Sequence, residues 1–434
     1  MSDDKGLMTR QIAYYILLEV LEQKRPLDQV LARREDFNAL AESRDRNFIR
    51  MLVSTALRRK GQMDVLIKKA QDKPQELKPT KIYFLLYIGI TQLLWMEVAD
   101  HAAVDVTVRL TEAEGMMKQK GLVNALLRRI GREGKAWLEK LDFVQSNIAP
   151  WLLEQWVKDY GLVEAEKISQ SSLTEAKTDI TLKDTSTEWA EKLGGKMLAT
   201  GSLRLDKASG ITQLEGFEEG AWWVQDASAA IPARLLGDLT GKSVIDLCAA
   251  PGGKTAQLAA QGANVIALDR SAKRMERLKE NMTRLGFEDK VDVAIGDGAV
   301  WLPPEPVDAV LLDAPCSATG TLRRHPDVMH LKSMTDVESL EKVQLRLLDH
   351  ATQMIKAGGI IIYCTCSLQK SEGEAQVEAF LTRHDDFKRQ PITADEIGGL
   401  SEVITSHGDL RIFPYHMENE GGMDGFFVAR LVKS

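Results

Sequence analysis

The chain has 434 residues, of which 44% are hydrophobic and 27% charged, with a formal net charge of -7. This length suits two or three domains that each bury a core, and the composition is that of a globular protein. With no basic and apolar leader and no apolar run long enough to span a bilayer, the sequence predicts a protein outside the membrane.

The cysteines indicate a reducing compartment. Cys248, Cys316, Cys364 and Cys366 all lie in the second half of the chain, too few and too uneven for a disulfide framework. We therefore expect a cytoplasmic protein. The Cys364-x-Cys366 pair has no partner cysteine or histidine at zinc-finger spacing, so we expect no metal.

The front of the chain is helical and basic. Residues 1–140 show apolar positions at three- and four-residue spacing, without strand-like alternation, and predict one helical domain. They carry 25 lysines and arginines against 19 acids, a local charge of +6, whereas the remainder carries -13. This imbalance favours contact with a polyanion, although basic solvated helix faces would give the same excess.

Residues 141–216 give a mixed pattern and predict a small α/β connector, with short strands near 178–183 and 202–205. Residues 217–434 alternate strand-like and helical stretches, which is typical of an α/β domain with a doubly wound, mostly parallel sheet. The expected helices are 273–285 and 336–355. The expected strands are 243–248, 264–269, 291–296, 309–313, 359–364 and a late, possibly antiparallel edge strand at 426–431.

Residues 243–255 (SVIDLCAAPGGKT) organise this domain. A β-branched apolar run predicts a buried strand, the small residues that follow predict a tight turn, and Lys254-Thr255 opens a helix. Such a strand–turn–helix unit brings backbone and helix N–H groups close to a nucleotide-like ligand. The turn fits neither the dinucleotide fingerprint nor the phosphate loop.

Three acids follow successive strands at the edge where ligands bind in this architecture. Asp269 ends the second strand, where nucleotide sheets hold ribose hydroxyls. Asp297 lies in a Gly-Asp-Gly turn after the third strand and could accept from an adenine amine, and Asp313 ends the fourth strand. One such acid is usually a cap, but three beside a glycine turn favour an adenosine-type cofactor.

Two cysteines indicate the chemistry. Cys316 lies just past the fourth strand and Cys366 just past the fifth, so their thiols converge if those strands are neighbours. A thiol near a cationic cofactor and strand-end dipoles can lose its proton and act as a nucleophile. We interpret Cys248 and Cys364 as small buried hydrophobes.

These segments resemble the Nol/Nop/Sun family of RNA cytosine-5 methyltransferases, and most closely its bacterial members that act on small-subunit (16S) ribosomal RNA. The run 121–130 (GLVNALLRRI) is similar to the closing helix of the NusB-type RNA-binding fold. The matching segments, in the family's order, are 223–228 (WVQDAS), 246–255, 313–320 (DAPCSATG), 323–327 (RRHPD), 365–367 (TCS) and 424–427 (DGFF). The segment 178–183 (TDITLK) departs from the family's connector pattern, which has an arginine and an asparagine there.

The resemblance implies S-adenosylmethionine as the methyl donor and a role for each motif. Cys366 would add to C6 of an unpaired or flipped cytosine, and Cys316 would assist loss of the C5 proton. Asp313 would contact the cytosine edge and border the cofactor, while Asp269 would hold the ribose and Asp297 the adenine. Arg323 and Arg324 would meet RNA phosphates. The methionine end would be lined by Cys248, Ala249, Ala250, Pro251, Gly252, Gly253 and Lys254.

Several alternatives stay open. The same chemistry could act on transfer RNA or another ribosomal site, or the chain could be an inactive RNA-binding or assembly factor. In DNA cytosine methyltransferases the proline-cysteine residue is the nucleophile, which would give that role to Cys316. We expect a monomer.

Overall fold

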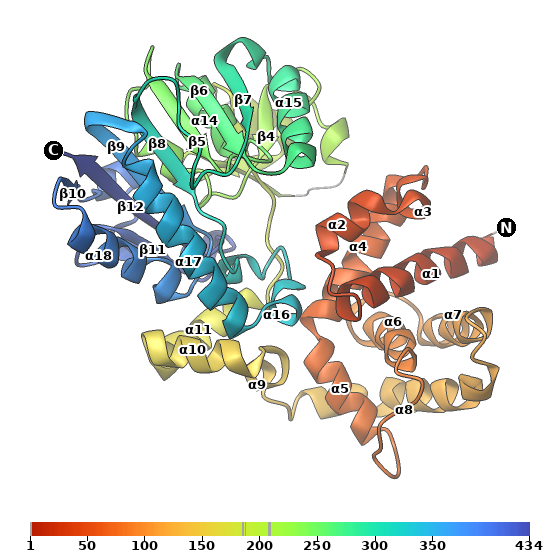
Figure 1. Ribbon diagram of the computed structural model, residues 1–434. Coiled ribbons are helices and arrows are strands. Elements are labelled where there is room, and N and C mark those ends of the chain that lie inside the picture. The colour runs from red at the N-terminus through yellow and green to blue at the C-terminus, as the bar shows by residue number, and fades with distance from the viewer. Residues whose placement is uncertain (1, 185, 187, 207–209) are drawn as a thin grey trace. The chain divides into compact units, whose positions relative to one another are not determined.

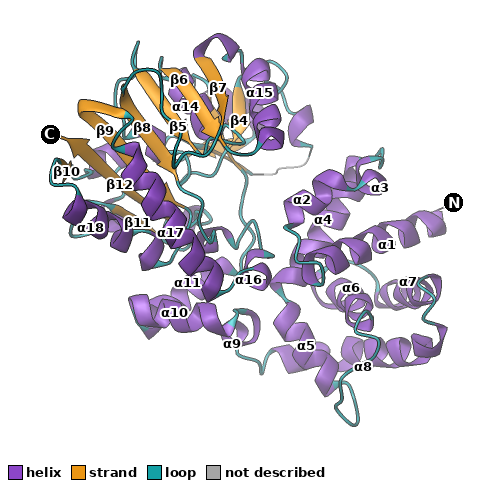
Figure 2. Ribbon diagram, in the orientation of Figure 1, coloured by secondary structure: helices purple, strands orange, loops and turns teal. Residues whose placement is uncertain are grey.

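The helical part of the chain is built around an apolar helix, α6 (Ile82–Trp95), as Figures 1 and 2 show. The computed structural model describes residues 2–184, 186, 188–206 and 210–434. α6 packs closely against α8 at Gly89, where a Cβ atom would come within 2.7 Å of the Leu127 side chain of α8. The other helices of this part are α1 (Ser2–Leu21), α2 (Leu27–Arg33), α3 (Glu35–Asn38), α4 (Ser43–Arg58), α5 (Lys60–Lys69), α7 (Asp100–Ala113), α8 (Lys120–Leu138), α9 (Phe143–Asn147), α10 (Pro150–Tyr160) and α11 (Leu162–Ser172).

Contacts divide the chain into two units. The helical unit comprises Met1–Lys158, Leu162–Leu173 and His325–Lys332, and the sheet unit comprises the remainder. The predicted connector is therefore divided: residues 141–158 and 162–173 belong to the helical unit, and the short strands that follow belong to the sheet unit. The segment with α16 (Val328–Leu331) is tied into the helical unit because the Asp327 carboxylate accepts from Leu27 N–H at 2.9 Å.

The main sheet of the sheet unit has the order β10-β12-β9-β8-β5-β6-β7, with β11 paired to β12. The five strands β9, β8, β5, β6 and β7 are parallel, and β12 runs antiparallel to β9. The predicted fold class is thereby confirmed, and so is the antiparallel direction of the late strand (Figure 2). Its predicted place at the sheet edge is wrong, because β10 and β11 pair with β12 on the side away from β9. The strands are β5 (Ser243–Leu247), β6 (Asn264–Asp269), β7 (Val291–Ile295), β8 (Val307–Asp313), β9 (Ile355–Thr365), β10 (Phe387–Arg389), β11 (Leu410–Ile412) and β12 (Phe426–Lys433).

Alternate residues of these strands enter two different cores, as the period of two requires. On one face Val244 and Leu311 pack with α13 (Ile231–Arg234), α14 (Gly253–Ala260) and α15 (Ala272–Leu285). On the other, Ile245 and Val310 pack with α17 (Met334–Ala351) and α18 (Glu374–Arg383). The predicted helix over 336–355 ends earlier, because Ile355 pairs with Val307 and begins β9.

A smaller sheet in the same unit has the order β2-β3-β1-β4. It includes both short strands predicted in the connector and continues into Trp222 and Trp223 of β4. Its bounds are β1 (Asp179–Leu182), β2 (Gly195–Met197), β3 (Leu203–Leu205) and β4 (Trp222–Val224), with α12 (Glu188–Leu193) between β1 and β2. Across the described residues, no helix combines the length and apolar character that crossing a membrane requires.

Candidate active site

The sheet order brings two sulfur atoms together. β8 and β9 are parallel neighbours, and Asp313 at the end of β8 is in register with Cys364 near the end of β9. The chain continues past both ends into turns that place Cys316 Sγ 3.5 Å from Cys366 Sγ. Backbone bonds hold the turns side by side, since Gly320 N–H donates to Cys366 O at 2.9 Å.

The two thiols lie within hydrogen-bonding distance of each other. The contact with Cys366, followed by burial, raises the pKa of the Cys316 thiol well above its ordinary value. Burial likewise raises the pKa of Cys364, whose side chain is fully enclosed.

An ion pair lies beside the sulfur atoms. Lys254, from the first turn of α14, places Nζ 2.8 Å from Asp313 Oδ2 and 5.1 Å from the centre of the Phe426 ring. Burial disfavours the ammonium, but Asp313, together with Cys364 and Asp246, outweighs that effect and raises the pKa of Lys254. The Asp313 side chain stays one-third exposed, so it can meet a ligand while Lys254 holds it in place.

A cavity opens at the ends of β5, β6 and β7. Among the residues predicted for the cofactor, Cys248, Asp269 and Asp297 line it, whereas residues 249–254 and Asp313 do not. Sequence reasoning missed the other lining residues, which come from β5, β6, α15, α17 and the loops after β6, β7 and β8: Leu247, Leu268, Arg270, Arg274, Gly296, Gly298, Pro315, Val343 and Leu347.

The turn after β5 has the backbone that a close ligand approach requires. Cys248 has a φ of 69°, a left-handed conformation that is uncommon outside glycine and concentrated at functional sites. Gly252, the residue before α14, has a φ of 104°, and a Cβ there would lie 3.0 Å from Leu278. Gly252 therefore lets the turn pack closely against α15.

The acids of the cavity fit an adenosyl ligand. Asp269 is buried, accepts from Ser271 N–H at 2.9 Å with Oδ1, and has Arg274 3.1 Å from Oδ2. Asp297 is exposed and accepts from Ala299 N–H at 3.0 Å. A buried carboxylate at the cavity wall can accept from a ribose diol, and an exposed one can accept from an amine donor.

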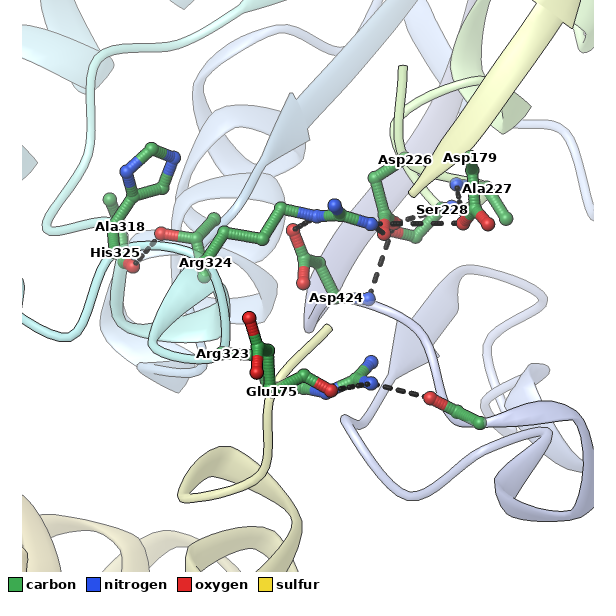
Figure 3. A network of polar contacts seen from close by, with 12 residues as sticks. Glu175, Asp179, Asp226, Ala227, Ser228, Ala318, Arg323, Arg324, His325 and Asp424 are labelled. Carbon is green, nitrogen blue, oxygen red and sulfur yellow. Dashed lines mark hydrogen bonds and ion pairs between the residues drawn. The ribbon is translucent and has the colours of Figure 1, made fainter. Parts of the chain in front are cut away.

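The arginine pair is held by protein groups, as Figure 3 shows. Arg324 donates to Asp226 at 2.6 Å and to Asp424 at 3.1 Å, and these acids raise its pKa despite burial. Arg323 is 2% exposed and donates to the backbone oxygen of Gly421. The predicted phosphate contacts stay a prediction, and for Arg324 they would require release of a carboxylate.

A second cavity and a possible metal centre were the other candidates for a site. A wider cavity of about 690 Å³ lies between the small sheet, α14 and residues 395–398, and none of the predicted site residues lines it. Within the described ranges, no group of three or more His, Cys, Asp or Glu side chains could hold a metal ion.

The fold and these contacts define a class: a doubly wound α/β domain with a nucleotide-type cavity and a cysteine pair beside it. Residues 233–432 match the family of the 16S rRNA methyltransferases RsmB/F, and residues 8–132 match the NusB family. A probable ribosomal RNA small subunit methyltransferase B from Synechocystis is 34% identical over 99% of this chain and 100% of its own length. The chain belongs to the RsmB/F family.

A second relative agrees with that assignment, and two solved structures share the fold. A ribosomal RNA small subunit methyltransferase B from Pasteurella multocida is 33% identical over 98% of this chain and 96% of its own. The crystal structure of PH0851 has the same fold with a TM-score of 0.77, at 23% identity over 99% of both chains. NSun6 from Pyrococcus horikoshii, solved with SFG, has a TM-score of 0.55 at 20% identity, covering 66% of this chain and 98% of its own.

Proposed function

We propose that this chain methylates C5 of a cytosine in 16S ribosomal RNA, with S-adenosylmethionine as the methyl donor. The observation that carries the proposal is the 3.5 Å approach of Cys316 Sγ and Cys366 Sγ beside an adenosyl-type cavity. Family membership and the relatives named for small-subunit ribosomal RNA support the choice of RNA. Such a substrate would be met in the cytoplasm.

The cofactor, when bound, supplies an electrophilic methyl group. In this proposal Asp269 accepts from the ribose hydroxyls and Asp297 from the adenine amine, while the turn at 248–253 approaches the methionine end. The left-handed backbone of Cys248, which lines the cavity, supports this placement, because such conformations concentrate at functional sites.

Cys366 is the nucleophile in this reaction. Its thiolate sulfur forms a bond to C6 of the cytosine, and the electron pair of the C5–C6 double bond moves toward N3 and becomes available at C5. C5 then takes the methyl group, and loss of the C5 proton restores the double bond as the sulfur–C6 bond breaks. Because Cys316 Sγ lies 3.5 Å from Cys366 Sγ, it is placed to assist that proton's departure.

Asp313 fixes the base for this attack. A carboxylate that is one-third exposed can accept from the cytosine amine, and the Lys254 ammonium 2.8 Å away keeps it oriented. Selecting cytosine over uracil then follows from the acceptor character of the carboxylate, since uracil has a carbonyl where cytosine has an amine. The NusB-type unit would choose the RNA through backbone and shape contacts.

Two cysteine variants test the chemistry. We expect Cys366→Ala to abolish methyl transfer, a loss of more than about ten-thousandfold, and to form no covalent complex with RNA. Cys316→Ala should accumulate a protein–RNA complex that survives denaturing electrophoresis, because elimination is blocked. The reverse pattern would make Cys316 the nucleophile, and two active, adduct-free variants would exclude covalent catalysis.

The RNA target needs a separate experiment. Bisulfite mapping of 16S, 23S and transfer RNA from cells with and without this protein should show one cytosine in 16S RNA that loses its methyl group. Restoring the wild-type chain should restore the mark, whereas Cys366→Ala should not. A mark that disappears from transfer RNA instead would replace the proposed substrate, and no change in any RNA would favour a non-catalytic role.

A further inference from the structure

A buried carboxylate binds both cysteine-bearing turns. Glu372, at the end of a short helical turn after β9, has no exposed surface. Its Oε1 accepts from Ser317 N–H at 2.9 Å, and its Oε2 accepts from Ser317 Oγ and from Ser367 Oγ, the latter at 2.5 Å. Ser317 follows Cys316 directly and Ser367 follows Cys366 directly.

The fourth hydrogen bond of the Glu372 carboxylate comes from Gln344, which also contacts the Cys316 turn. Gln344 of α17 donates from Nε2 to Glu372 Oε1 at 2.9 Å and to Pro315 O, also at 2.9 Å. Pro315 directly precedes Cys316, so the Gln344 side chain connects Glu372 to the residue on the N-terminal side of that cysteine. All four hydrogen bonds on the carboxylate therefore come from residues that flank a cysteine or touch such a residue.

The chemistry of this group is unusual for an acid with only a packing role. In the part of the chain that the structure describes, no ion pair joins Glu372 to a lysine, arginine or histidine. A buried carboxylate without a cation is costly unless several donors satisfy it, and a neutral side chain would fill the space at lower cost. The two serine hydroxyls also lie 3.1 Å apart, so one acceptor brings both turns together.

We propose that Glu372 is a positioning residue that holds the Cys316 and Cys366 turns at the sulfur separation needed for catalysis. It touches neither substrate nor cofactor in this inference, which rests on the proposed function for its catalytic consequence. Removing one acceptor oxygen should let the turns separate while the sheet beneath them stays intact. The sulfur–sulfur approach then becomes the quantity to measure.

The test uses the full chain with Glu372→Gln and a readout that needs no RNA. Diamide oxidises two adjacent thiols to a disulfide and takes up both protons and both electrons, so its rate reports how often the sulfur atoms meet. We expect the Cys316–Cys366 disulfide, identified from linked peptides by mass spectrometry, to form at least about tenfold more slowly in the variant.

Catalysis should change in the same direction. We expect kcat on unmethylated 16S RNA to fall about 30- to 300-fold, with KM for S-adenosylmethionine within about threefold of wild type. In the Cys316→Ala background, adding Glu372→Gln should slow adduct formation about tenfold or more. If the wild-type chain had no methyltransferase activity, the disulfide rate would still test the positioning role.

Asp409→Asn is the matched control, because it makes the same acid-to-amide change at another buried site. Asp409 is 2% exposed and pairs with Arg389 at 3.1 Å, without a hydrogen bond to either cysteine turn. In the Asp409→Asn variant, the rate of Cys316–Cys366 disulfide formation and kcat should both stay within about twofold of wild type. A normal disulfide rate in folded Glu372→Gln protein overturns the proposal, whatever its activity.

Two smaller variants keep the test open should Glu372→Gln fail to fold. Ser317→Ala and Ser367→Ala each remove one hydroxyl with little change in volume. Each should slow the disulfide reaction about three- to tenfold, and their combination should be less than additive because both act through one acceptor. Unchanged rates in both folded serine variants would also overturn the proposal.

Discussion

The two halves of the sheet edge are assembled in different ways. In the cofactor half, at β6 and β7, the acids bond to their own neighbours: Asp269 to Ser271 and Asp297 to Ala299, each two positions away. In the base half, at β8 and β9, the partners lie far apart in sequence. Cys316 and Cys366 are 50 positions apart, and Ser317 and Glu372 are 55.

This difference explains what each half can tolerate. A strand-end acid with local partners keeps its geometry as long as its own strand and turn form. A site built from distant turns depends on strand order and on groups such as Glu372 that join the turns. We therefore expect substitutions in the cofactor half to change ligand affinity and those in the base half to change the chemical step.

After the loss expected for Cys366→Ala, the largest effect is expected at Asp313. Asp313→Asn replaces the acceptor for the cytosine amine and removes the charge that Lys254 neutralises at 2.8 Å. We expect kcat to fall about a thousandfold, while KM for S-adenosylmethionine changes less than about fivefold. Steady-state kinetics on unmethylated 16S RNA would measure both.

The control for this variant lies on the same strand. Asp308 is at the opposite end of β8 and pairs with Lys356 at 2.8 Å. Asp308→Asn should leave kcat within about twofold of wild type. If Asp313→Asn instead raised KM for the cofactor with little loss of kcat, Asp313 would belong to the cofactor half.

At Asp269 we expect a smaller effect, and on KM rather than on kcat. Asp269→Ala removes the buried carboxylate of the cofactor cavity, so we expect KM for S-adenosylmethionine to rise about 30- to 100-fold, with kcat within about fivefold. Calorimetric titration with S-adenosylhomocysteine should show the same loss of affinity. Asp292→Ala, at an exposed position of β7 outside the cavity lining, should bind normally. Normal affinity in Asp269→Ala would remove Asp269 from the cofactor site.

Sequence reasoning reached most of the fold and only part of the site, for the same physical reason. Strand periodicity and turn residues are local, so the strands at β5 to β9 and the acids after them follow from short segments. The approach of Cys316 and Cys366 follows once β8 and β9 are known to be neighbours.

Other features have no local signal. Glu372 lies in a polar stretch, and only the folded turns show that its partners follow the two cysteines. The segment with α16 lies between two sheet-unit segments in the sequence, yet it packs in the helical unit through Asp327 and His330. Sequence reasoning assigns Arg324 to RNA phosphates, because its protein partners, Asp226 and Asp424, lie about 100 positions away on either side and meet it only in the folded chain.

The last prediction concerns Asp246, which lies between the two halves. Its strand β5 pairs with β6 on one side and β8 on the other. Asp246 is fully buried and accepts from Thr255 Oγ1 at 2.5 Å. Burial, and then the nearby charge of Asp313, raise its pKa to about 7 against the lowering effect of the Thr255 hydrogen bond.

The sign of the pH dependence follows from that shift. Between the ordinary pKa of an aspartate, about 4, and the folded value, the folded chain binds a proton that the unfolded chain has released. Stability therefore falls as pH rises through this window and levels off above about pH 7. Asp246→Asn carries no such proton, so between pH 5 and pH 8 the wild type should lose on the order of 2 kcal/mol more than the variant.

The thiols provide a way to follow this loss in the sheet unit alone, since all four cysteines lie there and Cys364 is fully buried. Labelling of Cys364 with a thiol reagent against urea concentration, at pH 5 and pH 8, would give the unfolding midpoint at each pH. Asp308→Asn is the control, because the pKa of Asp308 is shifted in the opposite direction from that of Asp246. The hydrogen bond from Lys356 lowers the pKa of Asp308 to about 2 and leaves it ionised across this range. Asp308→Asn should therefore lose stability between pH 5 and pH 8 as the wild type does. Equal losses in wild type and Asp246→Asn would mean that Asp246 is charged at pH 5, and that the two halves of the sheet edge share no proton-binding group between them.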